Sequence, residues 1–532
     1  MRTAAALLLL SAASAPCLAR VFTLDILHTN DVHGGIVSRD ATFLNPDFPP
    51  EIGGAAWLAS YVDSVRREAA GTGGYVLLLD AGDIYQGTPV GGYDLGASVV
   101  RWMNFVGYDA MTLGNHDFDD GAANALAIAA AADFPVLSCN FVEEATGLPP
   151  CGIEPMTFFE FEGVKIALIG LSTSDTWGLV DPALLEGYSF LDEEESVGAA
   201  MEEARRSGAD IVFVLSHLGQ PSDPGRYVES VRQAWISGEE FDKEFALNNA
   251  ELSSLLPGIA LIVSGHIHYG LARPWVNPFT GTIVVQGYAN GTGVGHIRLL
   301  IDSEARTVTG YELPRGEEIV NLLHDEFQPD PEALALIESF RTVAEAGMDE
   351  VIGEALEEIP RGGAEHPMGR LVADAVLECT GADVALVNRG GIRSSIPRGL
   401  ITPRMIYEAI PFEEDLYLVE VTGAQLRRIL ETGMQGRRRD MEPAGFTAVR
   451  NQALPDMAKI ESLIVGGEPV DSSRAYVLAT TGYLVQGNVG YDVMREFEAV
   501  PAGCTLFDAV VAYVKAHSPL EPDEVPRIRW TE

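Results

Sequence analysis

Histidine, aspartate and asparagine side chains gather in five short clusters along the first half of the chain. The clusters are Asp31-Val32-His33, Gly82-Asp83, Gly114 to Asp119, Ser216-His217 and Gly265-His266-Ile267-His268. A hydrolase with two metal ions needs such a set, because one carboxylate bridges cations ~3.5–4 Å apart while imidazoles and oxygen donors complete each shell. One such cluster alone is more often a capped loop. Five together predict a site for two metal ions, with the glycines letting the backbone turn tightly beside the ligands.

The stretches between these clusters predict the elements that position them. Short apolar runs, each ending in a polar cluster, predict strands at residues 22–28, 75–80, 111–113, 164–169, 211–215 and 259–263. They alternate with helical stretches rich in small residues, which is typical of an α/β domain. Ligand sites in α/β sheets lie beyond the carboxyl ends of strands, so the clusters are expected to meet there.

The second half predicts a separate α/β domain. After residue 283 the pattern changes to short strands and turns, and a helix is expected at residues 331–346 after Gln328-Pro329-Asp330. Beyond it we expect helices at 368–379 and 424–433 and strands at 384–388, 416–422 and 475–480. The predicted division is a signal peptide at 1–19, a metal-binding domain at 20–327, a helical linker at 328–349 and a second domain at 350–532.

Composition narrows the class of protein. The 532 residues include 77 acidic and 35 basic side chains, which gives a formal net charge of −42, and 47% of the residues are hydrophobic. The hydrophobic content is enough for real cores and argues against a disordered chain. The negative charge argues against nucleic-acid polymers as partners, because phosphate backbones are held by clustered Lys and Arg. An anionic substrate must therefore meet a local positive charge, such as an arginine or a metal ion.

The N-terminus has the pattern of a signal peptide cut after Ala19. A basic Arg2, an apolar stretch from residue 4 to about 13 and a small-residue cleavage pattern follow one another. Cys17 raises a lipoprotein alternative, but Pro16 fits a lipid-attachment site badly. No stretch reaches the ~18 apolar residues that a membrane span needs, and no anchor pattern appears near Glu532. We expect a periplasmic or extracellular protein without a stable membrane anchor.

Four cysteines remain after the predicted cleavage, an even number in an oxidising compartment. They are Cys139, Cys151, Cys379 and Cys504. Cys139 and Cys151 lie twelve residues apart across a loop rich in proline and glycine, and their pairing is the favoured disulfide. Zinc ligation is less favoured, because no C-x-x-C spacing occurs.

The order D-x-H, G-D, G-N-H-[DE], H and G-H-x-H resembles the calcineurin-like metallophosphoesterases. Residues 27–34 and 114–119 resemble in particular the 5′-nucleotidase / UDP-sugar hydrolase branch. The second half resembles the C-terminal substrate domain of that branch in four stretches: 368–371, 388–393, 411–412 and 482–491. The resemblance covers nearly the whole mature chain. It implies an α/β fold, with an N-terminal four-layer αββα sandwich followed by a C-terminal α/β domain of the 5′-nucleotidase type.

The resemblance also implies the roles of the clustered side chains. Two metal shells would share Asp83: Asp31, His33, Asp83 and His268 around one ion, and Asp83, Asn115, His217 and His266 around the other. His116 and Asp119 would form the catalytic dyad, with Asp117 as an alternative partner of His116. The ligand types suit two divalent ions such as Zn²⁺, Mn²⁺, Fe²⁺ or Co²⁺. Such ions neutralise phosphoryl oxygens and activate a water for attack on phosphorus, while His116 stabilises charge or protonates the leaving oxygen.

Five residues of the second domain match substrate-contacting positions of the family: Arg361, Asn388, Arg393, Phe412 and Tyr483. An arginine can hold an anionic group with two hydrogen bonds, and aromatic faces can stack on a nucleobase. Without the resemblance, the aromatics would be core residues and Arg393 half of a surface ion pair.

Three positions depart from the family's pattern. Val489 stands where the family has an aspartate that binds ribose hydroxyls, and Arg389 replaces a small glycine beside the substrate. Arg361 is offset by one residue. These departures leave the metal centre as expected and put nucleotide selectivity in question.

Together these features predict a metal-dependent phosphoric ester hydrolase that releases phosphate from 5′-nucleotides or related small phosphate esters. The alternatives with the same site are a 2′,3′-cyclic-nucleotide phosphodiesterase, a nucleotide-sugar hydrolase and a sulfur-ester hydrolase. The intact Gly114 to Asp119 stretch argues against the sulfur branch. A non-catalytic surface protein that binds nucleotides or metals is the alternative from another class, and the intact ligand set argues against it. The sequence predicts no oligomeric state.

Overall fold

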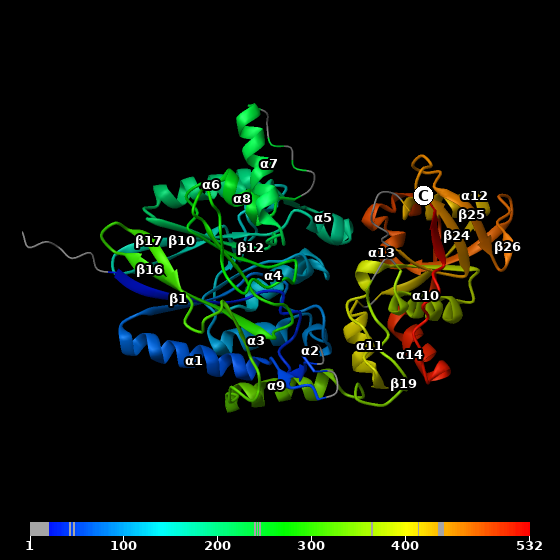
Figure 1. Cartoon of the computed structure of the whole chain (residues 1–532), viewed down its shortest axis with the longest axis horizontal. Coiled ribbons are helices and arrows are strands. Elements are labelled where there is room, and N and C mark those ends of the chain that lie inside the picture. The colour runs from blue at the N-terminus through cyan, green and yellow to red at the C-terminus, as the bar shows by residue number, and fades with distance from the viewer. Residues whose placement is uncertain are drawn as a thin grey trace, which may run out of the picture.

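The computed structural model describes residues 21–531 except 42–43, 46–47, 239–240, 242, 244–245, 363–364, 413 and 435–440. Two α/β lobes lie side by side, and helix α9 (Pro331–Ala344) lies beneath the first lobe at the point where the chain passes to the second (Figure 1). The predicted signal peptide falls outside the described residues. Within them, no helix is both long enough and apolar enough to cross a bilayer.

Two sheets form the centre of the first lobe. The larger has the order β17-β16-β1-β4-β5-β6-β8, with β18 paired to β16, and the smaller has the order β14-β15-β13-β12-β10-β9. The strands of the larger sheet are β1 (Val21–Thr29), β4 (Tyr75–Asp80), β5 (Ala110–Thr112), β6 (Val136–Leu137), β8 (Ile153–Glu154), β16 (Gly293–Asp302), β17 (Thr307–Glu312) and β18 (Ile319–Asn321). Those of the smaller are β9 (Met156–Phe161), β10 (Val164–Leu171), β12 (Ile211–Ser216), β13 (Leu261–Ser264), β14 (Trp275–Val276) and β15 (Ile283–Gln286).

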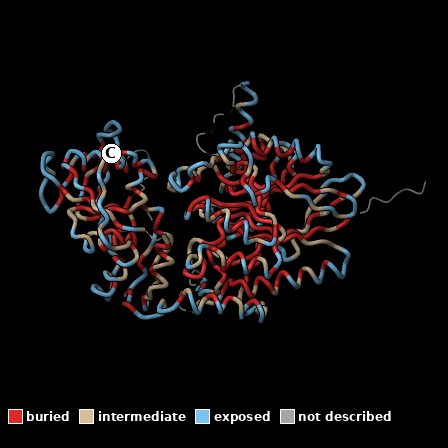
Figure 2. Tube along the Cα trace, turned by 180° about the vertical axis from the view of Figure 1, so that it is seen from behind, coloured by how far each residue is buried: buried red, intermediate tan, exposed pale blue. Residues whose placement is uncertain are grey.

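The two sheets pack face to face because their strands alternate side chains between two apolar faces. Leu24 and Ile26 of β1 point into the core between the sheets, whereas Leu27 packs toward the helices outside. The inner strands, such as β1, β12 and β13, are buried along most of their length (Figure 2). Each fully buried leucine or isoleucine contributes roughly 1.5–3 kcal/mol of transfer free energy.

Helices cover both outer faces of the sandwich. Those over the larger sheet are α1 (Ala55–Thr72), α3 (Ala97–Val106), α4 (Ala122–Ala131) and α9. Those over the smaller are α6 (Glu193–Arg206) and α8 (Asn249–Leu255). The lobe is therefore a four-layer αββα sandwich, which confirms the predicted fold.

A polar network ties the two central strands of the larger sheet together. Asp25 on β1 is buried and accepts hydrogen bonds from His296 Nε2 at 2.9 Å and Arg298 Nε at 2.8 Å, both on β16. Burial alone would raise the pKa of Asp25, but these hydrogen bonds and charges outweigh it and hold the pKa below its ordinary value.

Shorter elements decorate the first lobe. They are β2 (Arg39–Asp40), β3 (Glu51–Ile52), β7 (Phe141–Glu143), β11 (Tyr188–Phe190), α2 (Pro89–Gly92), α5 (Thr176–Leu179) and α7 (Pro224–Ser237). Helix α7 projects from the body of the lobe, while α2 faces the second lobe (Figure 1).

The second lobe has a five-stranded sheet of order β23-β20-β27-β22-β28 and a four-stranded sheet of order β26-β25-β24-β29. Its strands are β19 (Gly353–Ala355), β20 (Val384–Asn388), β21 (Gly399–Ile401), β22 (Asp415–Thr422), β23 (Met441–Ala444), β24 (Phe446–Asn451), β25 (Ile460–Val465), β26 (Glu468–Pro469), β27 (Ala475–Thr481), β28 (Ala499–Thr505) and β29 (Ile528–Thr531). Its helices are α10 (Pro367–Thr380), α11 (Pro403–Ala409), α12 (Gly423–Thr432), α13 (Gly482–Val485) and α14 (Leu506–His517). One core joins α10, α11 and α14 to the sheet, and another joins α12 to both sheets.

The expected pairing of Cys139 with Cys151 is wrong. Strands β6 and β8 run parallel, and Cys139 follows the end of β6 while Cys151 precedes the start of β8. The two residues thus lie at opposite ends of the strand pair, roughly 15 Å apart at ~3.3 Å per residue, whereas a disulfide needs Cα atoms within about 7 Å. Both are free thiols, and burial raises the pKa of Cys139 to about 12. The sulfur atoms of Cys379 and Cys504, by contrast, lie 2.6 Å apart.

Candidate active site

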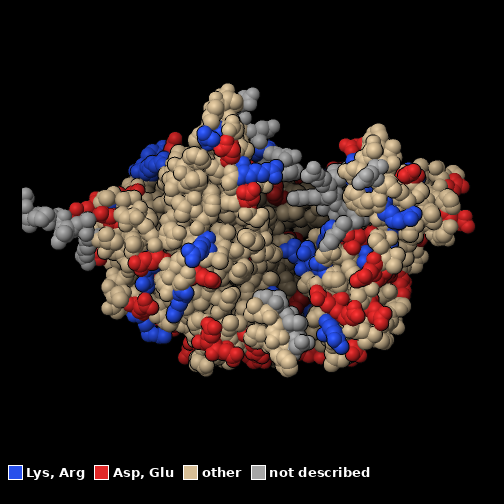
Figure 3. All heavy atoms as spheres, viewed as in Figure 1, with Lys and Arg blue, Asp and Glu red and all other residues tan. Residues whose placement is uncertain are grey.

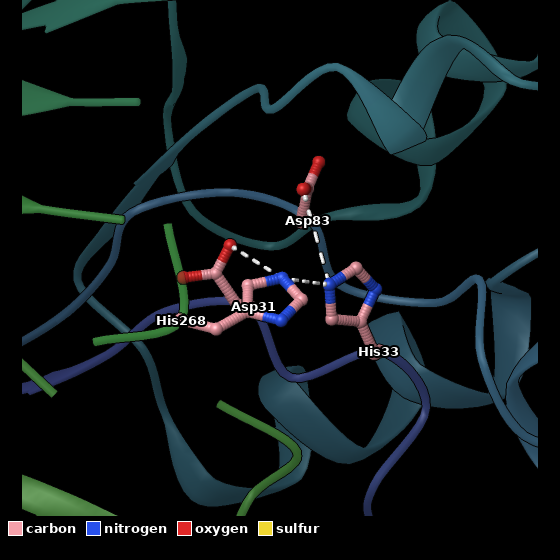
Figure 4. A group of neighbouring side chains, drawn as sticks. All are labelled: Asp31, His33, Asp83 and His268. Carbon is pink, nitrogen blue, oxygen red and sulfur yellow. Dashed lines mark hydrogen bonds and ion pairs between the residues drawn. The ribbon is translucent and has the colours of Figure 1, made fainter. Parts of the chain in front are cut away.

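The first group of possible metal ligands consists of Asp31, His33, Asp83 and His268, whose ligand atoms all lie within 4.8 Å of one another. His33 Nε2 lies 2.9 Å from His268 Nε2, and His268 Nε2 lies 3.6 Å from Asp31 Oδ1 (Figure 4). The residues follow β1, β4 and β13, whose carboxyl ends meet because β1 and β4 are parallel neighbours in one sheet and β13 lies in the facing sheet. The structure thus brings together the four side chains that the resemblance places around one ion.

The second group consists of Asp83, His217 and His266. His217 Nε2 lies 3.0 Å from Asp83 Oδ2, and His266 Nδ1 lies 2.9 Å from Asn115 Oδ1. Asp83 therefore belongs to both groups, as a bridging carboxylate must. All seven predicted ligands lie in this one cluster.

Backbone carbonyls orient two of the imidazoles. His33 Nδ1 lies 2.6 Å from the carbonyl of Gln86, and His217 Nδ1 lies 2.6 Å from the carbonyl of Ala81. Each Nδ1–H therefore donates to a carbonyl, which directs the Nε2 atom toward the cluster, as is typical of metal-binding histidines.

Charges in the cluster favour a bound cation. Burial lowers the pKa of His266 to about 3, with a further contribution from His217, and this keeps His266 neutral and able to ligate. Burial would also lower the pKa of His217, but Asp83 and Asp31 outweigh it and raise the pKa to about 10. The carboxylates of Asp83 and Asp31 therefore favour positive charge at this point of the cluster. The donor set, the paired Nε2 atoms and the bridging carboxylate fit two divalent ions.

The backbone at the cluster is strained. Five of the seven possible ligands have positive φ angles: Asp31 (48°), His33 (50°), Asp83 (61°), His266 (85°) and His268 (57°). Non-glycine residues rarely adopt this region, and each such residue costs on the order of 1–3 kcal/mol. The surrounding fold holds these conformations, which aim side chains from separate loops at one point.

Asp117 connects the loop that carries Asp83 to the loop that carries Asn115. Its buried carboxylate accepts hydrogen bonds from the backbone N–H groups of Asp83 (3.0 Å), Ile84 (2.9 Å) and Gly114 (2.8 Å). A Cβ atom on Gly114 would lie only 2.2 Å from Asp83 Oδ1, so only glycine fits this close approach. Asp117 is therefore not the partner of His116, and that alternative is wrong.

Asp119 is the carboxylate that holds His116. His116 Nδ1 lies 2.8 Å from Asp119 Oδ2, and the backbone N–H of His116 donates to Asp83 Oδ1 at 2.7 Å. Burial would lower the pKa of His116, but Asp119 and Asp83 outweigh it and the pKa is raised. The imidazole is thus kept protonated to higher pH, beside the ligand cluster, in a state that can donate a proton.

A cleft of about 900 Å³ lies between the two lobes. The space-filling view shows the molecule hollowed at this point (Figure 3). The first lobe contributes Asp83, Asn115, His116, Asp119, His266 and His268 to its lining. The second lobe contributes all five predicted substrate residues, Arg361, Asn388, Arg393, Phe412 and Tyr483.

Contacts across the cleft set the predicted substrate residues close to the ligand cluster. The rings of Phe412 and His116 have centroids 5.7 Å apart, and the guanidinium of Arg393 lies 5.9 Å from the Phe412 ring centroid. Burial lowers the pKa of His268 to about 4, and the positive charge of Arg393 adds to this effect. Arg361, which precedes α10, donates to the carbonyl of Ile392, the residue next to Arg393. Both arginines therefore place positive charge in the cleft on the side of the second lobe.

The two substituted positions lie in different surroundings. Arg389 binds the buried Glu442, with Nε 2.9 Å from Oε1, and so fixes the loop that follows β20. Val489 lines the cleft with a φ of 48° and offers it an apolar side chain.

Sequence reasoning missed Gln86 and Glu414, which also line the cleft. Gln86 Nε2 donates to the carbonyl of Pro411 at 3.1 Å, across the two lobes. Glu414 Oε2 accepts the backbone N–H of Tyr483 at 3.2 Å. The position of Glu414, two residues after Phe412 in a stretch already singled out, was the available signal.

Comparison with known proteins agrees with this geometry. The model of the calcineurin-like phosphoesterases matches residues 24–270, and the model of the 5′-nucleotidase C-terminal domain matches residues 350–496. The protein UshA of Yersinia enterocolitica is 27% identical over 98% of this chain and 98% of its own length. A 5′-nucleotidase of Vibrio cholerae is 25% identical over 94% of this chain and 92% of its own.

A solved structure extends the likeness to the whole fold. The crystal structure of a 5′-nucleotidase precursor from Thermus thermophilus is 26% identical, with a TM-score of 0.80 over 96% of this chain and 99% of its own. The two domain models follow one another in the same order as the two lobes. The chain therefore belongs to the calcineurin-like phosphoesterases, in the branch with a 5′-nucleotidase C-terminal domain, and is a metal-dependent phosphoesterase.

Proposed function

We propose that this protein is an exported phosphohydrolase with two metal ions that releases inorganic phosphate from 5′-nucleotides or related small phosphate esters. The observation that carries the proposal is the meeting of two ligand groups at Asp83, beside the His116–Asp119 pair and opposite the arginines of the second lobe. The relatives named 5′-nucleotidase support the substrate class. The N-terminal pattern and the UshA relatives support export to the periplasm or beyond the cell.

We assign the ligands as the resemblance implies. Asp31, His33, Asp83 and His268 would hold one ion, and Asp83, Asn115, His217 and His266 the other. The ions, when bound, neutralise the phosphoryl oxygens and lower the pKa of water enough to supply a nucleophile near neutral pH.

Side chains of the protein bind the substrate and transfer the proton. Arg393 and Arg361 receive the anionic group on the face away from the ligand cluster. His116, held by Asp119, stabilises the negative charge that develops on the phosphoryl oxygens and donates a proton to the leaving-group oxygen. Phe412 and Tyr483 offer aromatic faces to the leaving group, and Asn388 offers a polar contact. We place the first domain at 20–327, the linker at 328–349 and the substrate domain at 350–532.

The test is phosphate release from AMP, UDP-glucose, 2′,3′-cyclic AMP and sugar phosphates at equal concentration, with defined divalent metals. AMP should rank first, and His116→Ala should lower kcat by roughly 10²–10⁴-fold while metal content stays unchanged. Preference for a cyclic or sugar substrate would overturn the substrate class. Phosphate release by the chelated, metal-free protein would overturn the mechanism.

A further inference from the structure

Glu414 lines the cleft on the side of the second lobe, and hydrogen bonds hold its side chain in place. It precedes β22, is half-buried and lines the cleft. Its Oε2 accepts the N–H of Tyr483 at 3.2 Å, and the hydroxyl of Thr481 also bonds to its carboxylate. Burial raises the pKa of Glu414 to about 7 against the effect of these two hydrogen bonds. Groups from β27 and α13 therefore hold this carboxylate in place.

Glu414 retains acceptor capacity for a ligand. A carboxylate has about four acceptor positions. The N–H of Tyr483 uses one, and the single hydroxyl hydrogen of Thr481 is shared between Glu414 and Asn388 Oδ1. The neighbouring Asn388 receives the Thr481 hydroxyl on Oδ1 at 3.2 Å, so its amide offers mainly donors to the cleft. Val489 offers no polar atom. Glu414 is therefore one acceptor on this part of the wall, which Asp415 and Gln486 also line, and it is the one that contacts the backbone of Tyr483.

The charge distribution orients a phosphate ester in the cleft. Among the described residues, Arg361 and Arg393 have no carboxylate partner, and Arg393 lies close enough to His268 to affect its pKa. The phosphate end therefore belongs beside the arginines and the ligand cluster. In its ionised form, which predominates above about pH 7, the Glu414 carboxylate repels an anionic group and attracts a donor, so a neutral or cationic end of the ester is favoured there.

We propose that Glu414 selects phosphate esters whose leaving group carries hydrogen-bond donors, by accepting directly from a hydroxyl or amino group. This selection rests on the proposed function, because it assumes that the cleft receives a phosphate ester. Sugar hydroxyls and the exocyclic amine of a nucleobase share this chemistry. A site built to bond a donor discriminates strongly against an analogue that lacks it, because the acceptor is then left without a partner.

Calorimetric binding of nucleosides tests the selection without relying on catalysis. Adenosine, 2′-deoxyadenosine, 3′-deoxyadenosine and purine riboside, which lacks the 6-amino group, are compared on the metal-loaded wild type, Glu414→Leu and the isosteric Glu414→Gln. Wild type should bind adenosine about 10- to 100-fold more tightly than at least one analogue. Glu414→Leu should remove that preference, and Glu414→Gln should reduce it. The Glu420→Gln variant, on an exposed position of the same chain segment, is the matched control and should keep it.

The donor group is identified by the analogue that binds more weakly than adenosine to the wild type but equally well to Glu414→Leu. A deoxy-nucleoside that equals adenosine only in Glu414→Leu points to a sugar hydroxyl, and purine riboside that does so points to the amine. Wild-type protein that does not distinguish the four nucleosides, or a Glu414→Leu variant that keeps the preference, overturns the proposal.

Kinetics separate this proposal from the proposed function. The loss of kcat/KM in Glu414→Leu should be at least tenfold greater for AMP than for p-nitrophenyl phosphate, whose leaving group has no donor. Equal losses for both substrates would show general damage and overturn the selection. If wild type hydrolyses neither ester while nucleoside binding still depends on Glu414, the proposed function fails and the selection stands.

Discussion

Removal of the Asp117 carboxylate should weaken metal binding while the protein still folds. Asp117→Ala leaves three buried backbone N–H groups without an acceptor, those of Asp83, Ile84 and Gly114. Each buried donor without a partner costs roughly 1–3 kcal/mol, so the total is about 3–9 kcal/mol. This cost falls on the loops that present Asp83 and Asn115, because Asp117 joins those two loops.

Metal affinity is the expected readout. If the free energy of metal binding becomes less favourable by only 3 kcal/mol of this total, the metal dissociation constant rises by about 100-fold, since 1.4 kcal/mol corresponds to a tenfold change. The assay is metal stoichiometry by elemental analysis after dialysis against defined free Mn²⁺ or Zn²⁺, beside thermal unfolding followed by circular dichroism. Asp117→Asn keeps one side-chain oxygen and can preserve the two bonds made by Oδ2, so its loss should be smaller.

Asp119→Asn is the matched control for this prediction. It changes a carboxylate two residues away that bonds His116 and no backbone N–H of the Asp83 loop. It should keep both metals and lower kcat. The assignment is that Asp117 holds the loops of Asp83 and Asn115 together. It would be refuted if the Asp117→Ala variant kept two metals with wild-type affinity, or if the Asp119→Asn variant lost them.

Two further predictions concern the contact between lobes and the first sheet. Gln86→Ala removes the hydrogen bond to the Pro411 carbonyl but keeps the backbone carbonyl that orients His33, so it should raise KM for AMP roughly 2- to 10-fold with unchanged metal content; an altered metal stoichiometry would contradict this. The pKa of Asp25 is lower in the folded protein than its ordinary 3.8, so its stabilisation is complete above about pH 4 and is lost as pH falls through the folded-state pKa. Asp25→Asn should therefore lower the free energy of unfolding in urea by about 3 kcal/mol at pH 7 and by roughly 1 kcal/mol less at pH 3; an equal difference at both pH values would contradict it.

The sequence predicts the elements that local pattern determines. The strand predicted at residues 75–80 matches β4, and the one at 384–388 matches β20, because each is a short apolar run between polar residues. The ligand residues were identified because their side chains carry the chemistry themselves. Their convergence follows from the rule that functional loops lie at the carboxyl ends of parallel strands.

Residues that act through distant backbone were beyond the reach of sequence patterns. Asp117 stands beside His116 in the chain, which suggests a partnership, yet its carboxylate reaches the backbone of a loop 34 residues away. The Cys139–Cys151 prediction failed for the same reason. Short separation along the chain suggested proximity, whereas the parallel pairing of β6 and β8 places the two residues beyond opposite ends of the strand pair.

The positive φ angles of the ligand residues were equally invisible. Nothing in the residue types of His33 or His268 announces a left-handed backbone, which the packing of the loops imposes. Glu414 escaped notice because its one signal in the sequence, a position two residues after Phe412, does not distinguish it from the other glutamates of an acidic chain.

Back-titration of the chelated protein with metal tests the central claim most directly. Protein stripped with a chelator is given increasing Mn²⁺ or Zn²⁺, and bound metal and phosphate release from AMP are measured on the same samples. Activity should be absent without metal and should rise to its maximum as two ions bind per chain, with Asp83→Ala failing to recover at any metal concentration. Full activity in the stripped protein, or two bound ions with no phosphate release, would contradict the claim that Asp83 joins two metal sites in one hydrolytic centre.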